Sequence, residues 1–374
     1  MIRIAIDAQL IGRPGGVGGY VASLLQALAE HDPDNEYVVY VPAGVRVPDA
    51  LPADRFHVRE SPLTRVRALR VLWQQRRLPR LLLRDAADLL HCPSYVVPLR
   101  AAPPVVLTLH DVIALKHPEL CSRANALHYR RHLPAAVRKA RLILASSETT
   151  RRDILETCDV APERVRTVYP GLDPRFRPVP EPEARAGVRK ALGLPDRFVL
   201  FVGNIEPKKD LETLIKAYAE LADPLSGCSL VIAGAPLRGV RKLRRLVAAH
   251  GLNRRVRFTG FVPAEHLPAL YSAAELFVFP SRYEGFGLPP VEAMACGTPV
   301  VCSDGGALPE VVGKAAKVFP AGDVAALVQA IRLVLTDETL RQRVIADGQA
   351  RAAMLDWAGS VRLVLEAYRD AAAP

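Results

Sequence analysis

Short, almost entirely apolar runs alternate with helix-forming stretches along the chain, and this alternation constrains the fold more than any other feature. Strands that are apolar throughout are typical of parallel sheets covered on both faces. The stretches between them show helical spacing, as with Leu211, Leu214, Ile215 and Tyr218. This order predicts an α/β fold of βαβ units. The predicted strands are 2–7, 37–41, 56–58, 88–92, 105–109, 142–146, 165–169, 198–203, 229–234, 256–260, 276–280, 299–303 and 316–319.

The number of predicted strands is too large for one doubly wound sheet, so we expect two Rossmann-like domains in these 374 residues. The segment 170–187 contains five prolines and few large apolar residues, which is typical of a linker. The sequence therefore predicts an N-terminal domain over 1–182 and a C-terminal domain over 190–356. The tail 357–374 has the pattern of a helix.

Composition excludes several classes of protein. No apolar stretch approaches the roughly 20 residues that span a bilayer, and the first ten residues do not resemble a signal peptide. The six cysteines form no C-x-x-C pair, so we expect neither a zinc site nor a disulfide framework, which fits a cytoplasmic protein. The net charge of +11 indicates acidic partners such as phosphorylated small molecules, anionic lipid or nucleic acid.

The segment 280–301 carries the clearest functional pattern. A strand ends at Pro280, a loop with glycines follows, and two prolines stand where a helix is expected to begin. A helix N-terminus presents free N–H groups that suit a phosphate. Glu284 in the loop and Glu292, which we expect in the first helical turn, would accept hydrogen bonds from hydroxyl groups. A solvated loop acid and a carboxylate that complements the helix dipole are the alternative interpretations.

The segment from Glu284 to Glu292, within EGFGLPPVEAMACGTPVV, resembles the E-x7-E motif of retaining glycosyltransferase family 4. The N-terminal glycine loop, the HDV at 110–112, VGNIEPKKDLETLIKAY (202–218) and the tail with Trp357 are similar to this family too. The resemblance implies the GT-B fold, in which two Rossmann-like domains face each other across a cleft and the last helix crosses back to the first domain. The N-terminal domain would bind the acceptor and the C-terminal domain a nucleotide-sugar donor.

The resemblance also implies roles for residues of the motif. Glu284 would bind hydroxyls of the donor sugar and take part in catalysis, and Glu292 would bind the ribose. The residues between them that complete the donor site would be Gly285, Phe286, Gly287 and Leu288.

A basic loop follows the predicted strand 198–203. Its lysines stand at the carboxyl end of a strand, where open α/β sheets bind ligands. By resemblance, Lys209 is catalytic because it stabilises the departing diphosphate, and Asn204 and Lys208 bind the donor. Family members often carry arginine at the position of Asn204, so we expect Lys208 or Arg282 to compensate.

Two further segments belong to the predicted N-terminal domain. The glycine loop before a helix expected at 20–29 is not a dinucleotide fingerprint, because Val21 stands where the third glycine would be. In the glycosyltransferase interpretation, Gly16 approaches the donor phosphate, and Gly18 and Tyr20 border the acceptor.

The HDV segment ends the predicted strand 105–109. By resemblance, His110 contacts the donor sugar and the acceptor region as a catalytic residue. We expect Asp111 nearby, contacting the acceptor or orienting His110; a purely structural histidine and a loop cap are the alternatives.

The stretch 61–84 holds seven arginines and no acid, with Val66, Leu69, Leu72 and Trp73 on one helical face before Pro79, which we expect to break the helix. Such a helix suits peripheral contact with an anionic membrane. Alternatively, its apolar face packs on the first sheet and the arginines are solvated. Nucleic-acid binding is disfavoured because aromatic residues are not interleaved with the charges.

The predicted activity is transfer of a sugar from a nucleotide-diphosphate sugar to a hydroxyl with retention of configuration. Mannose from GDP-mannose is favoured by resemblance, and the acceptor is a saccharide, a lipid-linked saccharide or a small molecule. No cluster of metal ligands is evident, so we expect no metal and no cofactor, and a front-face mechanism. The alternatives are a sugar-nucleotide 2-epimerase of similar architecture and a non-catalytic nucleotide-sugar-binding protein. We expect the enzyme in the cytoplasm or on the inner face of the membrane.

Overall fold

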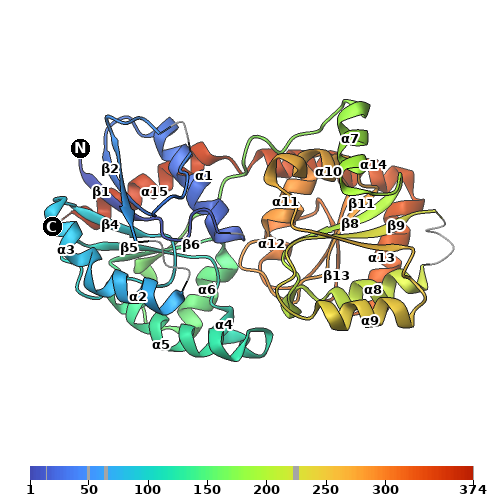
Figure 1. Ribbon diagram of the computed structural model, residues 1–374, viewed down its shortest axis with the longest axis horizontal. Coiled ribbons are helices and arrows are strands. Elements are labelled where there is room, and N and C mark those ends of the chain that lie inside the picture. The colour runs from blue at the N-terminus through green and yellow to red at the C-terminus, as the bar shows by residue number, and fades with distance from the viewer. Residues whose placement is uncertain (14, 49–50, 63–65, 222–226, 374) are drawn as a thin grey trace. The chain divides into compact units, whose positions relative to one another are not determined.

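The computed structural model describes residues 1–13, 15–48, 51–62, 66–221 and 227–373. The chain divides into two compact units, of which unit 1 comprises Met1–Gly171 and Asp356–Pro374 and unit 2 comprises Leu172–Leu355 (Figure 1). The boundary lies earlier than the one expected at residue 182. The segment 172–189 belongs to unit 2, and the helix α7 begins inside the expected linker, because Pro182 is tolerated in its first turn.

Unit 1 contains a parallel seven-stranded sheet in the order β3-β2-β1-β4-β5-β6-β7. Every strand predicted in this half of the chain is present. The strands are β1 (Arg3–Asp7), β2 (Glu36–Pro42), β3 (Phe56–Ser61), β4 (Leu89–Cys92), β5 (Val105–Leu109), β6 (Leu142–Ala145) and β7 (Val165–Thr167). The helices are α1 (Gly16–His31), α2 (Arg67–Arg76), α3 (Leu78–Arg84), α4 (Ile113–Lys116), α5 (Arg123–Lys139), α6 (Glu148–Thr157) and α15 (Trp357–Ala372), with short 3₁₀ helices at Pro118–Leu120 and Pro162–Arg164.

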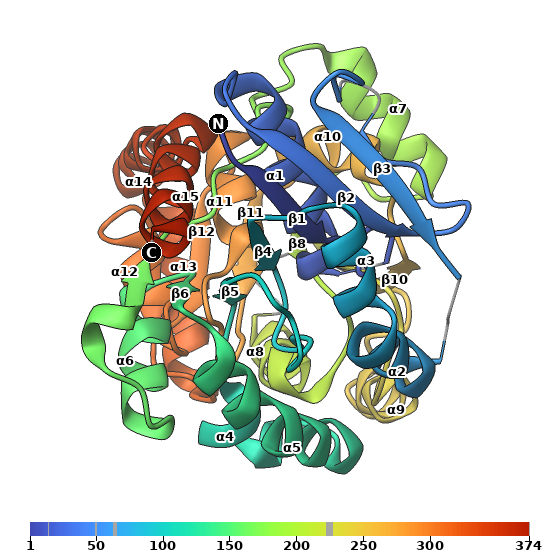
Figure 2. The ribbon, with the colours of Figure 1, turned by 90° about the vertical axis from the view of Figure 1, so that its left-hand side faces the viewer.

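Two layers of helices cover this sheet, as strands apolar on both faces require. α1 and α15 pack on one face, and α3, α5 and α6 pack on the other (Figure 2). The C-terminal helix thus returns to the first domain, as expected, and lies beside α1 although the two are far apart in sequence (Figure 1). Val361, Val364 and Tyr368 of α15 are all buried in this core.

One local expectation for unit 1 is wrong. The first helix begins at Gly16 and not at residue 20, so the glycines at 16, 18 and 19 form its first turns. The expected break near Pro79 is present, because α2 ends at Arg76. A second helix, α3, then begins at Leu78 with Pro79 in its first turn.

Unit 2 contains a parallel six-stranded sheet in the order β10-β9-β8-β11-β12-β13, and each predicted strand of this half is present as well. The strands are β8 (Phe198–Val202), β9 (Ser229–Ala233), β10 (Val256–Gly260), β11 (Leu276–Phe279), β12 (Val300–Ser303) and β13 (Lys317–Phe319). The helices are α7 (Pro182–Leu192), α8 (Leu211–Glu220), α9 (Val240–Ala249), α10 (Leu267–Ser272), α11 (Leu288–Ala295), α12 (Leu308–Val312), α13 (Val324–Thr336) and α14 (Glu338–Ala353), with 3₁₀ turns at Pro207–Lys209 and Ala264–His266.

The strand order places one special position in each sheet. In unit 2 the chain passes from β8 outward to β10 and then returns to build β11 on the other side of β8. In unit 1 the same reversal occurs between β1 and β4. Open α/β sheets bind their ligands outside the carboxyl ends of the strands at such a switch point.

Candidate active site

The loops after β8 and β11 meet at the switch point of unit 2. The loop after β8 ends in the 3₁₀ turn Pro207–Lys209, and the loop after β11 leads to Glu284. The backbone N–H of Arg282 donates to the carbonyl of Lys208 at 2.8 Å, which ties the two loops together. Strand order alone therefore brings side chains 75 residues apart in sequence into contact.

Glu284 is the centre of a buried ion-pair cluster. Its Oε1 accepts from Nζ of Lys209 at 2.5 Å, and Nζ of Lys208 lies 3.6 Å from its Oε2. Glu284 and Lys209 are 7% and 8% exposed. Burial opposes ionisation of Glu284, but Lys208 and Lys209 outweigh it and lower its pKa to about 2. The sequence prediction that these three residues form one site is consistent with this geometry, and two ammonium groups around one carboxylate leave a positive site.

The surroundings of Lys209 hold it in place. Its Nζ lies 4.7 Å from the ring centroid of Phe279, the last residue of β11. Burial lowers the pKa of Lys209, and Glu284 opposes that shift. The next residue, Asp210, has a left-handed backbone (φ 46°) and accepts from Nε of Arg282 at 3.0 Å and from Oγ1 of Thr213 at 2.9 Å. Sequence reasoning missed Asp210, although an acidic residue directly after two lysines was a visible signal.

The motif loop turns sharply into α11. Gly287 has φ 103°, a conformation that few other residues adopt, and a Cβ there would lie 2.6 Å from Leu308. α11 then begins at Leu288, with the two prolines in its first turn as expected. The donor-binding roles expected for Gly285, Phe286, Gly287 and Leu288 stay predictions, and Phe286 is 7% exposed.

Glu292 lies in the second turn of α11 and not in the first, so its carboxylate does not complement the helix dipole. Its Oε2 accepts from the hydroxyl of Tyr271 on α10 at 2.7 Å. Burial raises the pKa of Glu292 to about 7, although Tyr271 opposes the shift. A hydroxyl group that donates a hydrogen bond to this half-buried carboxylate stabilises its ionised form. Tyr271 was missed because nothing in the sequence links it to the motif.

The switch point of unit 1 brings the histidine loop and the glycine segment together. Nε2 of His110 lies 3.3 Å from the carbonyl of Pro93, just after β4, and its ring stands edge-on to Tyr20 with centroids 4.6 Å apart. Burial lowers the pKa of His110, so its neutral form is favoured. Asp111 accepts from the N–H of Ile113 at 3.2 Å, which is the loop cap that the sequence left as an alternative.

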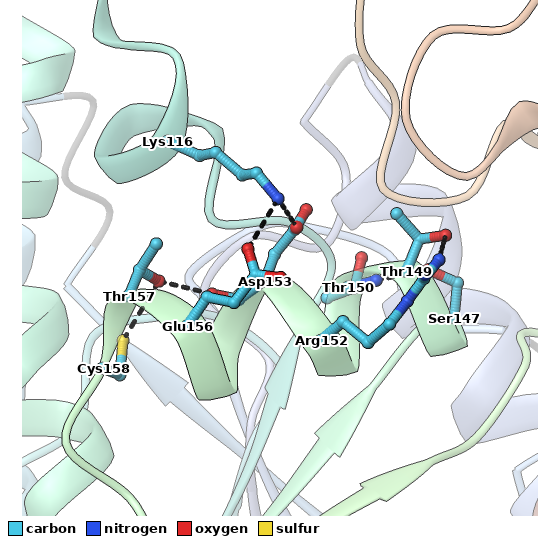
Figure 3. A network of polar contacts seen from close by, with 9 residues as sticks. All are labelled: Lys116, Ser147, Thr149, Thr150, Arg152, Asp153, Glu156, Thr157 and Cys158. Atoms are coloured by element: carbon cyan, nitrogen blue, oxygen red, sulfur yellow. Dashed lines mark hydrogen bonds and ion pairs between the residues drawn. The ribbon is translucent and has the colours of Figure 1, made fainter.

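The helix α6 fixes the backbone of His110. Oγ of Ser146 and Oγ1 of Thr150 approach the carbonyl of His110 at 2.9 and 3.4 Å, and Ser147 caps the helix by accepting from the N–H of Thr150 at 2.9 Å. Figure 3 shows the rest of this network, in which Lys116 of α4 reaches Asp153 and Glu156 on α6. The network anchors α6 under the histidine loop, and sequence reasoning missed it.

The glycine segment has both open and crowded positions. A Cβ at Gly16 would meet nothing within 4 Å, whereas one at Gly18 would lie 2.5 Å from the carbonyl oxygen of Arg13. Gly16 is therefore the open position, as a ligand contact requires. Tyr20 is 6% exposed and packs in the core beside Trp357, where its ring also supports His110. The acceptor contacts expected for Gly18 and Tyr20 stay predictions. The donor-binding role expected for Asn204 stays a prediction.

Among the described residues, no group of three or more His, Cys, Asp and Glu side chains is placed to hold a metal ion. Within the same part of the chain, no helix has the length and apolar composition needed to cross a membrane.

Comparison with known proteins finds glycosyltransferases along both units of the chain. Residues 14–176 match the family model described as Glycosyltransferase Family 4, and residues 187–351 match the model described as Glycosyl transferases group 1. O-antigen chain mannosyltransferase B of Escherichia coli is 33% identical over 316 residues, which are 83% of this chain and 81% of that protein. The serotype-specific mannosyltransferase WbdA of Escherichia coli is 32% identical over 74% of this chain, which spans only 35% of WbdA.

A solved structure has the same fold. HepE of Anabaena, in complex with UDP and glucose, superposes with a TM-score of 0.79 at 24% identity, and the match covers 99% of both chains. Together with the two Rossmann-like sheets, the returning C-terminal helix and the Glu284–Lys209 pair, these matches show that the chain is a glycosyltransferase with the GT-B fold and belongs to glycosyltransferase family 4.

Proposed function

We propose that this glycosyltransferase moves a mannosyl group from GDP-mannose to a hydroxyl of a saccharide acceptor, with retention of configuration. The observation that carries the proposal is the buried cluster of Lys208, Lys209 and Glu284 at the switch point of unit 2. Its excess of positive charge suits a diphosphate, and its carboxylate suits sugar hydroxyls. Mannose is supported by the mannosyltransferases among the relatives.

The roles of the donor-site residues follow from their chemistry. Lys209 and Lys208 receive the negative charge that develops on the departing diphosphate, and the N-terminus of α11 adds its positive dipole end. Glu284 accepts hydrogen bonds from the sugar, and Glu292 accepts them from the ribose. These groups supply the charge stabilisation that a metal ion would otherwise supply, so the proposed reaction needs no metal.

Glu284 is a poor nucleophile in this arrangement, because its carboxylate is held between two ammonium groups. We therefore assign a front-face reaction. The bond from the anomeric carbon to the diphosphate breaks as the acceptor oxygen bonds to that carbon on the same face. The acceptor proton passes to the leaving phosphate oxygen. A glycosyl-enzyme trapped on Glu284, or a burst of released GDP in the absence of acceptor, would contradict this mechanism.

The nucleotide is tested by measuring Tm with GDP, UDP and ADP, because a ligand of the native state raises Tm. We expect the largest rise with GDP, and EDTA should leave both this rise and transfer unchanged. Lys209→Ala should lower kcat at least 100-fold, whereas Lys216→Ala, at an exposed position on α8, should leave it unchanged. Equal activity of the two variants would contradict the site.

The acceptor class is tested by product analysis with and without a mannose-terminated oligosaccharide. We expect a product one hexose longer, with the anomeric configuration of the donor, only when the oligosaccharide is present. A 2-epimer formed without acceptor would assign the chain to sugar-nucleotide epimerisation instead.

We also infer peripheral contact with the inner face of the cytoplasmic membrane. Val66 just before α2, Leu69 and Leu72 on α2, and Leu83 on α3 are between 51% and 66% exposed, and arginines lie among them. Such a surface suits anionic lipid. We expect binding to phosphatidylglycerol vesicles but not to phosphatidylcholine vesicles, and loss of binding in Leu69→Gln/Leu72→Gln. Leu237→Gln, at an exposed position in unit 2, is the control. Equal sedimentation of all three proteins would contradict the contact.

A further inference from the structure

Arg70 of α2 is a buried cation with one unsatisfied nitrogen. The residue is 6% exposed, and its Nη1 has no hydrogen-bond partner among the described residues. Within the same residues, no carboxylate lies within the 4 Å of an ion pair to this guanidinium. Burying an unpaired charge costs several kcal/mol. A group from outside the described chain that supplies negative charge would remove this cost.

The inward face of α2 mixes polar and apolar side chains. Arg70 and Gln74, four residues apart, are 6% and 2% exposed, and Trp73 beside them packs against the core with its ring edge-on to Tyr40. Leu69 and Leu72 are 52% and 51% exposed, although apolar residues of a surface helix normally face the core. The helix thus buries a guanidinium and an amide beside Trp73. Of the apolar face expected to pack on the sheet, only Trp73 does so, and Arg70 is not solvated as that alternative required.

The groups around Arg70 add positive charge. Burial lowers the pKa of Arg70, and repulsion from Arg13 and Arg67 lowers it further. The rings of Tyr95 and His128 lie beside the cluster with centroids 5.7 Å apart, and Nε2 of His128 has no partner among the described residues. Burial, Arg67 and Arg70 lower the pKa of His128 to about 4, so its ring is neutral near pH 7.

The carboxylate that attracts Arg70, Asp7, is already engaged by other groups. Asp7, at the end of β1, accepts from Nε2 of Gln74 at 2.5 Å, and from the N–H of Gln9 at 3.4 Å. Burial raises the pKa of Asp7 to about 6, and Arg70 only partly opposes this. The other amide atom of Gln74, Oε1, has no partner among the described residues. The cluster therefore offers an unpaired cation and, one helical turn away, an unpaired acceptor.

All these groups lie at the carboxyl edge of the sheet of unit 1. Asp7 ends β1, Arg13 follows it, α2 follows β3, and Tyr95 follows β4. The cluster therefore lies at the switch point between β1 and β4, where this sheet is expected to bind a ligand.

We propose that Arg13, Arg67 and Arg70 bind a phosphate group of the acceptor, and that Gln74 accepts a hydrogen bond from a neighbouring hydroxyl. Guanidinium groups bind phosphate oxygens in pairs, and the local excess of positive charge matches a dianion. This inference rests on the proposed function, because it assigns the acceptor to unit 1 and names its chemistry. The acceptor is then a phosphorylated sugar or polyol, or a saccharide on a lipid-linked diphosphate.

The test measures Tm of the full chain saturated with GDP, so that the donor site is filled, while inorganic phosphate is added. We expect phosphate to raise Tm of the wild type and of Arg76→Gln, which removes the same charge from an exposed position of α2. Arg70→Gln should lose this rise while its GDP affinity stays unchanged. Arg70→Lys keeps the positive charge and should recover part of the phosphate-dependent rise in Tm. The lysine variant therefore still tests the site if Arg70→Gln does not fold.

Kinetics identify the source of the phosphate. If the acceptor is a soluble sugar phosphate, Arg70→Gln should raise KM for that compound at least 10-fold. If the acceptor is a saccharide on a lipid diphosphate, the same rise should appear with that substrate in micelles. In both cases kcat/KM for a neutral oligosaccharide should stay unchanged.

Three results would overturn the proposal: no phosphate-dependent rise in Tm in the wild type, an equal loss in Arg76→Gln, or a fall of GDP affinity in Arg70→Gln. A phosphate-dependent rise that needs Arg70, in a protein that binds no nucleoside diphosphate, would instead leave this site standing and reject the proposed donor.

Discussion

At the residue scale, Lys209 and Glu284 compensate each other's buried charge when no substrate is bound. Each partner is more than nine-tenths buried, and the hydrogen bond between them replaces part of the hydration that each loses. The pair keeps Lys209 charged although burial lowers its pKa. The proposed diphosphate site is thereby already charged in the free protein.

Breaking this pair from one side should destabilise the protein. Glu284→Gln leaves Lys209 buried without a carboxylate, and we expect a loss of about 3 kcal/mol in the free energy of unfolding. The double variant Glu284→Gln/Lys209→Met removes both charges and should recover most of that loss, although it stays inactive. Urea denaturation without nucleotide measures this double-mutant cycle. Additive losses from the two single variants would show that the residues are not coupled.

Glu292 should make stability depend on pH. Its pKa is raised from 4.5 to about 7 in the native state. Below pH 4.5 both native and unfolded forms are protonated, and the group has no effect. Between pH 4.5 and 7 only the native form keeps the proton, so stability falls as pH rises, by about 3 kcal/mol in total. Glu292→Gln should remove that loss.

The measurement is the stability difference between Glu292→Gln and the wild type at pH 5 and at pH 8. We expect the variant to gain stability relative to the wild type as pH rises. The same difference at both pH values would contradict the raised pKa. Because ribose hydroxyls favour the ionised carboxylate, donor binding near pH 6 should also release a proton, which titration calorimetry in two buffers detects.

At the element scale, the first turns of α1 are governed by how close the preceding loop comes. A Cβ at Gly18 would lie 2.5 Å from the carbonyl oxygen of Arg13 and 2.8 Å from that of Leu10, whereas one at Gly19 would meet nothing within 4 Å. The two neighbouring glycines thus have different structural effects. The first permits close approach of backbone, and the second only weakens the helix.

Alanine substitutions should separate these effects. Gly18→Ala forces the loop away, and we expect it to lower the free energy of unfolding by about 2 kcal/mol. Gly19→Ala at the adjacent helical position should raise it by about 1 kcal/mol, because alanine favours the helix. Thermal unfolding of both variants at one pH measures the contrast. Destabilisation by both substitutions to the same extent would contradict the assigned close approach.

At the scale of the whole molecule, the C-terminal helix makes the first domain depend on the last residues of the chain. Val364 and Tyr368 of α15 are 0% and 1% exposed in the core of unit 1. The hydroxyl of Tyr368 also lies 2.6 Å from Nδ1 of His91 on β4, whose Nε2 lies 2.8 Å from Oγ1 of Thr108 on β5. The two ends of the chain therefore share one core.

Damage to α15 should consequently weaken unit 1 and leave unit 2 unaffected. Val364→Asp buries an unpaired carboxylate, and we expect the unfolding transition of unit 1 to fall by about 10 °C in calorimetry. Leu363→Asp, at a neighbouring position that is 38% exposed, should change it little. GDP should still raise the transition of unit 2. Loss of both transitions together would show that the units unfold as one.

The sequence by itself determined the strands, their parallel arrangement in two sheets, the return of the last helix and the family, because these depend on local apolar periodicity and on contiguous motifs. Only the tertiary structure decided which distant side chains meet. The contacts of Asp210 with Arg282 and of Tyr271 with Glu292, and the repulsion that Arg13 and Arg67 exert on Arg70, depend on how distant segments pack, which local patterns do not encode. The orientation of α2 is the clearest case. Its apolar pattern predicts that Val66, Leu69, Leu72 and Trp73 face inward, yet only Trp73 packs on the core, and Arg70 and Gln74 are buried beside it, because a helix is oriented by everything packed around it and not only by its own periodicity.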